Sequence, residues 1–447
     1  MREPVAAEFI PEHGTPAPIA YQIVKDETFP QTQPRLNLAT FVTTYMDDYG
    51  TRLMNDAVGV NYIDETEYPR VAVMCGRCIN MVANMWHTPE KGDWKTGAVG
   101  IGSSEACMLG GVAAWLRWRE RRKAAGKPYD KPNLVMSTAY QVVWEKFCQL
   151  WQIEMRTVPI THKHPTLDIE QALRLCDENT ICIVPIAGVT WTGMNDDIEA
   201  LDFALDGYNA KTGHNIPIHV DAASGGFILP FLDPEKKWDF RLKWVLSIST
   251  SGHKYGLVYP GLGWVVWKDK QYLPKEMNFS VNYLGANITQ VGLNFSRPAA
   301  QILGQYYNFL HLGVEGYREI HSNSMAIAKY CHEAIGQIPC FQNYAGNAVH
   351  QQSQHVRIGN DVGVVADGGG LNILPVSRQL AFQQGAEIVA HLHLSANVAL
   401  LPAFVNGAGV GVDGGNDDLH GVQTQVVAGK TLPDGFLQHI ADANQVG

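Results

Sequence analysis

The sequence predicts an α/β protein in which helices cover both faces of a mostly parallel sheet. Between residues 133 and 268, short apolar runs that read as buried strands alternate with segments of helical period. This alternation is typical of strand–helix–strand units, which build parallel sheets. The chain has 447 residues, 46% of them hydrophobic, which suffices for a large core and a second, smaller domain.

The elements of this sheet are expected as follows. Strands are predicted at residues 133–137, 154–160, 181–186, 216–220, 243–248 and 262–268. Helices are predicted near residues 142–151, 168–176 and 196–209. A Gly-rich turn at residues 97–107 opens a further helix that runs to about residue 125, where Gly126 is a natural stop.

The chain divides into three expected parts. Residues 1–35 read as an irregular N-terminal arm, because prolines stand at positions 4, 11, 16, 18, 30 and 34. Residues 36–325 are expected to form the large domain, which starts with a helical pattern at Leu36. Another long helical pattern, from Ser296 to about residue 337, leads toward a small C-terminal domain of residues 326–447.

Composition excludes several classes of protein. The net charge of −10 and the lack of a long basic run argue against nucleic acid or an anionic membrane as the main partner. No signal peptide and no apolar run near 18 residues is recognisable. The eight cysteines are scattered, and Cys75 and Cys78 lie in a helical pattern as structural thiols, so a cytoplasmic location is expected.

The stretch SISTSGHKYG, residues 247–256, places a lysine between two predicted strands. Lys254 is therefore expected in a turn between core elements. A lysine held in such a site can lose its proton and attack a carbonyl carbon. The alternative is a lysine whose stem packs at the strand end while its amine stays in water.

A second stretch, HVDAASGG at residues 219–226, ends another predicted strand. Asp221 is expected at the carboxyl end of that strand, where open α/β sheets place groups that bind ligands. An acid there and a lysine after a later strand are the two groups that a pyridoxal phosphate site needs most. The lysine reacts with the cofactor's aldehyde, and the carboxylate keeps its ring nitrogen protonated.

Together with NFSRPA at residues 294–299, these motifs resemble the pyridoxal-phosphate-dependent group II decarboxylases, and among them the bacterial glutamate decarboxylases. The resemblance covers about residues 33–344. It implies a fold-type-I enzyme with a seven-stranded type of sheet, pyridoxal 5'-phosphate as cofactor and L-glutamate as substrate. It also implies a homo-oligomer, at least a dimer with shared active sites and in some relatives a hexamer.

The resemblance assigns cofactor contacts beyond Lys254 and Asp221. These are Ser103 and Ser104 at the phosphate, Gln141 and Ala223 on the two ring faces, Thr190, His253 near the phosphate or as a proton donor, and Ser296 at a neighbouring subunit's phosphate. The residues alone are less specific. A Gly/Ser-rich helix start binds phosphate through free N–H groups, but ordinary N-caps look the same. Thr190 by itself would be a turn hydroxyl.

The resemblance also assigns a substrate site. The positions of Thr40, Phe41, Asn61 and Asp64 match residues that hold the substrate's side-chain carboxylate in the family. Two carboxyl groups in contact cannot both be ionised comfortably, so Asp64 against a substrate carboxylate would favour acidic working conditions. The alternative is a capping pair of Asn61 and Asp64 in a loop.

After residue 344 the composition changes. All 11 Trp and all 17 Tyr lie at or before Tyr344, and the tail has only Arg357, Arg378 and Lys430 as basic residues. The family uses a C-terminal arginine for the substrate's α-carboxylate, and neither tail arginine lies in a family-like motif. The tail is interpreted either as the product of a shifted reading frame or as a divergent small domain.

Three functions follow as hypotheses. The first is α-decarboxylation of L-glutamate to 4-aminobutanoate and carbon dioxide. The second is decarboxylation of another amino acid. The third is a catalytically impaired homologue that binds the cofactor, which the atypical tail would explain. Transamination fits the motif set less well.

Overall fold

The structure is a computed structural model. It describes residues 8–29, 31, 34, 41–161, 164–190, 192–281, 288–337, 364–367 and 370–373. The chain forms two compact units, one of residues 1–40 and 377–444, the other of residues 41–376 and 445–447. The expected division at residues 35 and 325 stays a prediction.

In the first unit, helix α1 (Ala17–Thr28) replaces the irregular arm that the prolines predicted. The physical reason is their spacing. Pro16 is the N-cap residue and Pro18 lies in the first turn, where the missing N–H group costs nothing. No proline follows until position 30, so 12 residues are free to form the helix.

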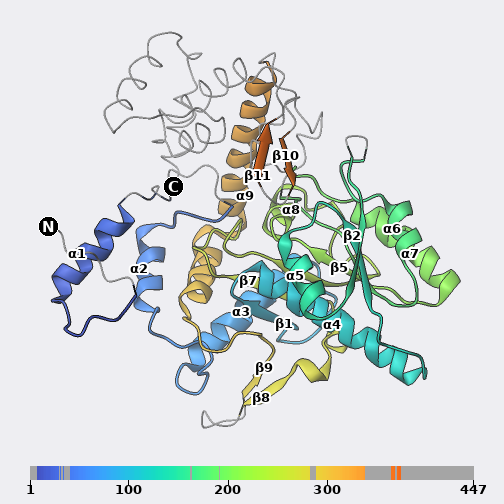
Figure 1. Ribbon diagram of the computed structural model, residues 1–447, viewed down its shortest axis with the longest axis horizontal. Coiled ribbons are helices and arrows are strands. Elements are labelled where there is room, and N and C mark those ends of the chain that lie inside the picture. The colour runs from blue at the N-terminus through green and yellow to red at the C-terminus, as the bar shows by residue number, and fades with distance from the viewer. Residues whose placement is uncertain are drawn as a thin grey trace. The chain divides into compact units, whose positions relative to one another are not determined.

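The second unit is built on a seven-stranded sheet, which confirms the predicted fold class (Figure 1). In chain order the strands are β1 (Gly97–Gly100), β2 (Asn133–Ser137), β3 (Glu154–Val158), β4 (Thr180–Val184), β5 (Ile218–Asp221), β6 (Val245–Thr250) and β7 (Gly263–Trp267). Their order in the sheet is β1-β7-β6-β5-β4-β2-β3. Strand β7 runs antiparallel to both neighbours, so the other six strands share one direction.

Strand β1 was missed in the sequence, where its residues read as part of a Gly-rich turn. Its four residues are GAVG, so no apolar run announces a strand. It forms because β7 supplies hydrogen bonds along its whole length, from Gly97 opposite Val266 to Gly100 opposite Gly263. Tertiary pairing thus overrides a weak local preference.

The helices of this unit cover the sheet on both faces. They are α2 (Asp48–Asp56), α3 (Pro69–Met85), α4 (Ser103–Ala124), α5 (Val142–Leu150), α6 (Ile169–Leu175), α7 (Ile198–Thr212), α8 (Leu229–Leu232) and α9 (Ala300–Gly336). Alternate residues of a strand enter different cores, as the pleat requires. In β2, Leu134 and Met136 pack in a cluster with α4 and α5, whereas Val135 packs in the cluster that contains α3, α7 and α9.

Two hairpins complete the described chain. Strands β8 (Phe279–Val281) and β9 (Ile288–Gln290) pair and extend away from the sheet (Figure 1). Strands β10 (Val364–Asp367) and β11 (Gly370–Ile373) are the described part of the atypical tail. None of the helices in the described ranges combines the length and apolar character that crossing a membrane requires.

The direction of the strands fixes where the site lies. Because β1, β2, β4, β5 and β6 are parallel to one another, their carboxyl ends meet at one edge of the sheet. Ser103 follows β1, Gln141 follows β2, and Asp221 ends β5. Lys254 follows β6, and all four residues therefore belong to this edge.

Candidate active site

Lys254 lies in the turn between β6 and β7, as its sequence context predicts. A residue distant in sequence fixes this turn. The backbone N–H group of Thr43 donates to the carbonyl oxygen of His253 at 2.8 Å, and its hydroxyl donates to the carbonyl oxygen of Lys254 at 2.6 Å. Burial lowers the pKa of Lys254, while the neighbouring Asp221 opposes the shift. The amine therefore loses its proton more readily than a lysine in water.

The carboxylate of Asp221 is 3% exposed and held in one orientation. Its Oδ2 accepts a hydrogen bond from Nε1 of Trp144 at 2.8 Å, and its Oδ1 accepts one from the backbone N–H of Ala223 at 3.1 Å. Trp144 belongs to α5, so the helix after β2 orients an acid at the end of β5. Nothing in the local sequence of Trp144 signals this contact.

Backbone hydrogen bonds join the acid to the lysine. The N–H group of Ala222 donates to Ser249, that of Ser251 donates to Ala223, and that of Lys254 donates to Ser251. These bonds measure 2.9, 3.2 and 3.3 Å respectively. The segment that carries Asp221 and the segment that carries Lys254 are thus hydrogen-bonded to each other at the edge of the sheet.

A buried histidine and a thiol lie beneath the acid, and sequence reasoning missed both. His219 contacts the hydroxyls of Ser247 and Ser249 through its two ring nitrogens, at 2.7 and 3.1 Å. The thiol of Cys107 lies 3.2 Å from the Ser249 hydroxyl. Burial lowers the pKa of His219 to about 3, so the ring is neutral at neutral pH. Its place two residues before Asp221 on the same strand face was the available signal.

The turn between β1 and α4 approaches the lysine turn closely. Gly102, the N-cap residue of α4, has φ 114°, and no side chain caps this helix. A Cβ atom at Gly102 would lie 2.9 Å from Cε1 of His253, so a larger residue would push the two turns apart. Ser103 is half-buried and Ser104 is exposed in the first turn of the helix.

His253 is oriented by the backbone that follows it. Its Nδ1 accepts hydrogen bonds from the N–H groups of Leu262 at 3.1 Å and Gly261 at 3.3 Å. These bonds assign the ring proton to Nε2. Burial and then the charge of Lys254 lower the pKa of His253 to about 4.

Comparison with known proteins decides the family. Residues 11–350 match the pyridoxal-dependent decarboxylase conserved domain. The chain belongs to this family. It is 52% identical over 328 residues to glutamate decarboxylase beta of Listeria innocua serovar 6a, a match that covers 73% of the chain and 70% of the relative.

Further relatives agree. The glutamate decarboxylase of Lactococcus lactis subsp. cremoris is 50% identical, with 72% of the chain and 70% of the relative covered. Among solved structures, Lactobacillus brevis CGMCC 1306 glutamate decarboxylase aligns with a TM-score of 0.73 and 46% identity, covering 76% of the chain and 77% of the solved chain. A Burkholderia pseudomallei K96243 sphingosine-1-phosphate lyase, at 23% identity and TM-score 0.64, shares the fold alone; it covers 75% of the chain and 78% of the solved chain.

The match of this pyridoxal-dependent decarboxylase to its family ends at residue 350. The composition changes after Tyr344, so the two boundaries nearly coincide. Most of the tail lies outside the described residues. The family resemblance therefore rests on the large sheet unit.

The residues at the sheet edge fit the family's pyridoxal phosphate. The hydroxyl oxygens of Thr250 and Ser251 are buried and have no partner within the part of the chain that the structure describes. Thr250 ends β6 and Ser251 follows it, four and three residues before Lys254. Buried hydroxyls in native proteins normally have a partner, so this edge has polar groups left for a ligand.

Three further cofactor candidates are described by their local structure alone. Gln141 is exposed and is the N-cap of α5, where its Oε1 accepts from the Val143 N–H group at 2.8 Å. Thr190 is half-buried and follows Gly188, whose φ is 86°. Ala223 is half-buried beside Asp221. Their cofactor contacts stay predictions.

The candidate substrate-binding residues differ in what the structure shows of them. Asn61 has a structural contact, because its Oδ1 accepts from the backbone N–H of Arg297 at 3.2 Å. Asp64 and Phe41 are half-buried, and Thr40 lies outside the described residues. Ser296 is exposed on this unit, which leaves its hydroxyl accessible from outside. Their substrate or cofactor roles stay predictions.

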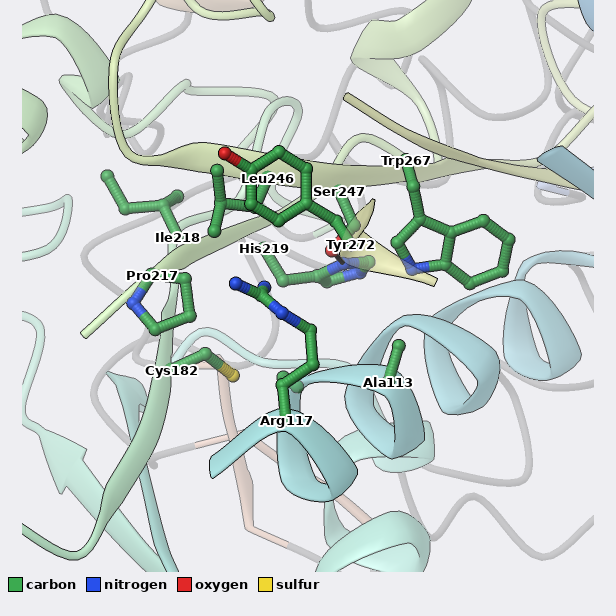
Figure 2. A pocket seen from close by; sticks show the side chains of 11 residues that line it. Ala113, Arg117, Cys182, Pro217, Ile218, His219, Leu246, Ser247, Trp267 and Tyr272 are labelled. Carbon is green, nitrogen blue, oxygen red and sulfur yellow. Dashed lines mark hydrogen bonds between the residues drawn. The ribbon is translucent and has the colours of Figure 1, made fainter. Parts of the chain in front are cut away.

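A small cavity lies behind the site, between α4 and the sheet. Figure 2 shows Arg117 pointing into it, and His219, Trp267 and Tyr272 also line it. Its volume is about 10 Å³, roughly the room that one water molecule needs. The cavity is therefore too small for the cofactor. The Arg117 guanidinium carbon lies 4.6 Å from the Tyr272 ring centroid.

Proposed function

We propose that this protein catalyses the pyridoxal-phosphate-dependent α-decarboxylation of L-glutamate to 4-aminobutanoate and carbon dioxide. The observation that carries the proposal is that Lys254 and the oriented, buried Asp221 lie at one edge of the sheet, in a chain about half identical to named glutamate decarboxylases. The reaction class follows from the family, and the substrate is the one in the relatives' names.

In this proposal the chain holds the cofactor at the carboxyl edge of the sheet. Lys254 is the attachment point, Asp221 pairs with the ring nitrogen, and Ala223 and Gln141 contact the ring faces. Ser103, Ser104, Thr190 and His253 serve the remaining polar groups. Support comes from the uncapped start of α4, because free N–H groups at a helix start favour a phosphate.

When bound, pyridoxal phosphate supplies an electron sink for the bond between the α-carbon and its carboxylate. Asp221 favours a proton on the ring nitrogen, and Trp144 and Ala223 keep its carboxylate in place. Lys254 is uncharged more often than a lysine in water, so its Nζ can accept or return a proton.

The side chain of the substrate is proposed to lie near Asp64, with Phe41 and Thr40 beside it. Asn61 would act there by holding the backbone at Arg297 in place. A carboxyl group opposite Asp64 would have to share a proton with it, which favours mildly acidic conditions.

The assembly and location are also proposals. Ser296 is exposed, which agrees with a role at a neighbouring subunit's phosphate in a homo-oligomer of two or more chains. A cytoplasmic location agrees with the cysteines of the described part, which are buried free thiols.

The test is a substrate panel with the full chain and added pyridoxal phosphate. L-Glutamate should release carbon dioxide and yield 4-aminobutanoate, while L-aspartate and L-tyrosine should react far more slowly. Faster turnover of a substrate without a side-chain carboxylate would favour a decarboxylase of another amino acid.

A second candidate is a catalytically impaired homologue that binds the cofactor. It is favoured by the tail after Tyr344, whose two arginines lie in no family-like motif. Cofactor binding without turnover of any panel member would establish it, and keto-acid formation would reveal a transaminase instead.

A further inference from the structure

Glu105 is a buried acid that no part of the proposed chemistry uses. It lies in the first turn of α4 and is 6% exposed. Its Oε2 accepts from the Ile101 N–H group and from the side-chain amide of Asn294, both at 2.8 Å. Its Oε1 accepts from the N–H groups of Leu293 at 2.8 Å and Asn294 at 3.1 Å. Each carboxylate oxygen of Glu105 thus accepts two hydrogen bonds.

The bond from Ile101 joins residues close in sequence, whereas the other three bonds join residues far apart in sequence. A glutamate in the first helical turn often accepts from the backbone just before the helix, as in a capping box. Capping alone would leave Oε1 in solvent. Here Leu293 and Asn294 lie 188 and 189 residues away in sequence, so the same carboxylate joins two distant segments.

The space around Glu105 is tight on both sides. A Cβ atom at Gly100 would lie 2.9 Å from Cβ of Glu105, and one at Gly292 would lie 3.3 Å from its Oε1. The guanidinium group of Arg297 adds a contact at 3.7 Å and donates to the Val99 carbonyl oxygen at 2.9 Å. The turn before α4 and residues 293–297 are therefore locked to each other.

We infer that Glu105 is a positioning residue for the phosphate group of the cofactor. Its carboxylate sets the geometry of the turn that presents Ser103 and Ser104, and it holds the segment that carries Ser296 in register with that turn. The inference rests on the proposed function, because it takes this turn as the phosphate site.

The test measures binding of two probes to the apoprotein, pyridoxal 5'-phosphate and pyridoxal, which lacks the phosphate. In Glu105→Gln one acceptor oxygen becomes an amide donor that faces donors. Affinity for pyridoxal phosphate should fall roughly 10- to 100-fold, the size expected for a charge-assisted hydrogen bond. Affinity for pyridoxal should change little. Tryptophan fluorescence quenching reports both without any need for turnover.

The matched control is Glu120→Gln, which removes an exposed acid from the same helix. It should leave the affinities for both probes unchanged. A role of Glu105 in stability alone predicts a lower unfolding temperature with equal changes for both probes, and that result would overturn the inference. So would an unchanged affinity for pyridoxal phosphate.

A second variant covers the case in which Glu105→Gln does not fold. Asn294→Ala removes only the side-chain bond to Oε2 from an exposed residue. It should reduce affinity for pyridoxal phosphate several-fold and spare pyridoxal; equal effects on both probes contradict the inference. If the unaltered protein binds neither probe, the proposed function fails, which is distinct from failure of Glu105 alone.

Discussion

At the scale of single residues, the candidate site depends on how one buried carboxylate is oriented. Asp221 accepts from the indole of Trp144 and from the backbone at Ala223. The backbone bond persists in any side-chain variant. The indole bond can be removed alone, so its contribution is measurable.

Trp144→Phe should retain the aromatic packing of Trp144 against Phe147 and lose the hydrogen bond to Oδ2. A hydrogen bond to a charged group contributes about 1.5–3 kcal/mol, so turnover of L-glutamate should fall roughly 10- to 100-fold. Steady-state kinetics with saturating cofactor measure this. Trp151→Phe, on the same cluster but away from Asp221, is the control. Equal activity of the two variants would show that orientation by Trp144 does not matter.

At the scale of elements, side chains of α9 bind the backbone of the turn that follows Lys254. Nε2 of Gln305 and the hydroxyl of Tyr317 both donate to the Gly256 carbonyl oxygen, at 3.0 and 2.9 Å. The Oε1 of Gln305 accepts from the indole of Trp264 at 3.2 Å. The helix thus ties the turn after Lys254 to strand β7.

Gln305→Ala should lower the unfolding free energy by about 1–3 kcal/mol, because it leaves the buried indole of Trp264 without its acceptor. Urea unfolding of the apoprotein measures the loss. Gln301→Ala, one turn earlier and more exposed, should cost less than about 1 kcal/mol. If the two variants were equally stable, the buried contacts of Gln305 would not support the turn.

The sequence predicts site residues that follow a local pattern, and it does not predict contacts between residues far apart in the chain. Asp221 and Lys254 were predicted because each follows a short apolar run, and parallel strands bring such ends together. Trp144 was not predicted, because its acceptor lies 77 residues away. Glu105 binds across 189 residues and Gln305 across 49, and no local pattern encodes those contacts.

Elements of the fold were likewise predicted only where the local sequence indicates them. Strand β2 was predicted with its observed bounds, since its apolar residues 134–136 lie between the polar residues Asn133 and Ser137. Strand β1 was not, because GAVG has no strand signal without its partner. The α1 helix was missed because the prolines around it were given more weight than the 12 residues between Pro16 and Phe29.

At the scale of the whole molecule, buried histidines contribute to the loss of stability in acid. Burial lowers the pKa of His219 to about 3 and those of His253 and His321 to about 4. Above pH ~6.5 these rings are neutral in both folded and unfolded chains. As the pH falls from ~6.5 toward 4, the unfolded chain takes up protons that the folded chain does not, so stability falls.

His321 offers a clean test, because it is fully buried among Phe231, Tyr255 and Tyr317 and outside the site. A shift from ~6.5 to about 4 corresponds to about 3 kcal/mol lost on acidification. His321→Phe should remove this part of the loss between pH 7 and 4.5, measured by urea unfolding at both values. An unaltered pH dependence in His321→Phe would refute the assignment.

Lys254 and Asp221 are proposed to form the centre of an L-glutamate α-decarboxylase. The most direct measurement is release of labelled carbon dioxide from L-glutamate carrying the label in either its α-carboxylate or its side-chain carboxylate. The full chain with pyridoxal phosphate should release label from the α-carboxylate alone, and Lys254→Ala should release none above background. Release from the side-chain position, undiminished release by Lys254→Ala, or no release by cofactor-loaded protein would rule out this role of Lys254 and Asp221.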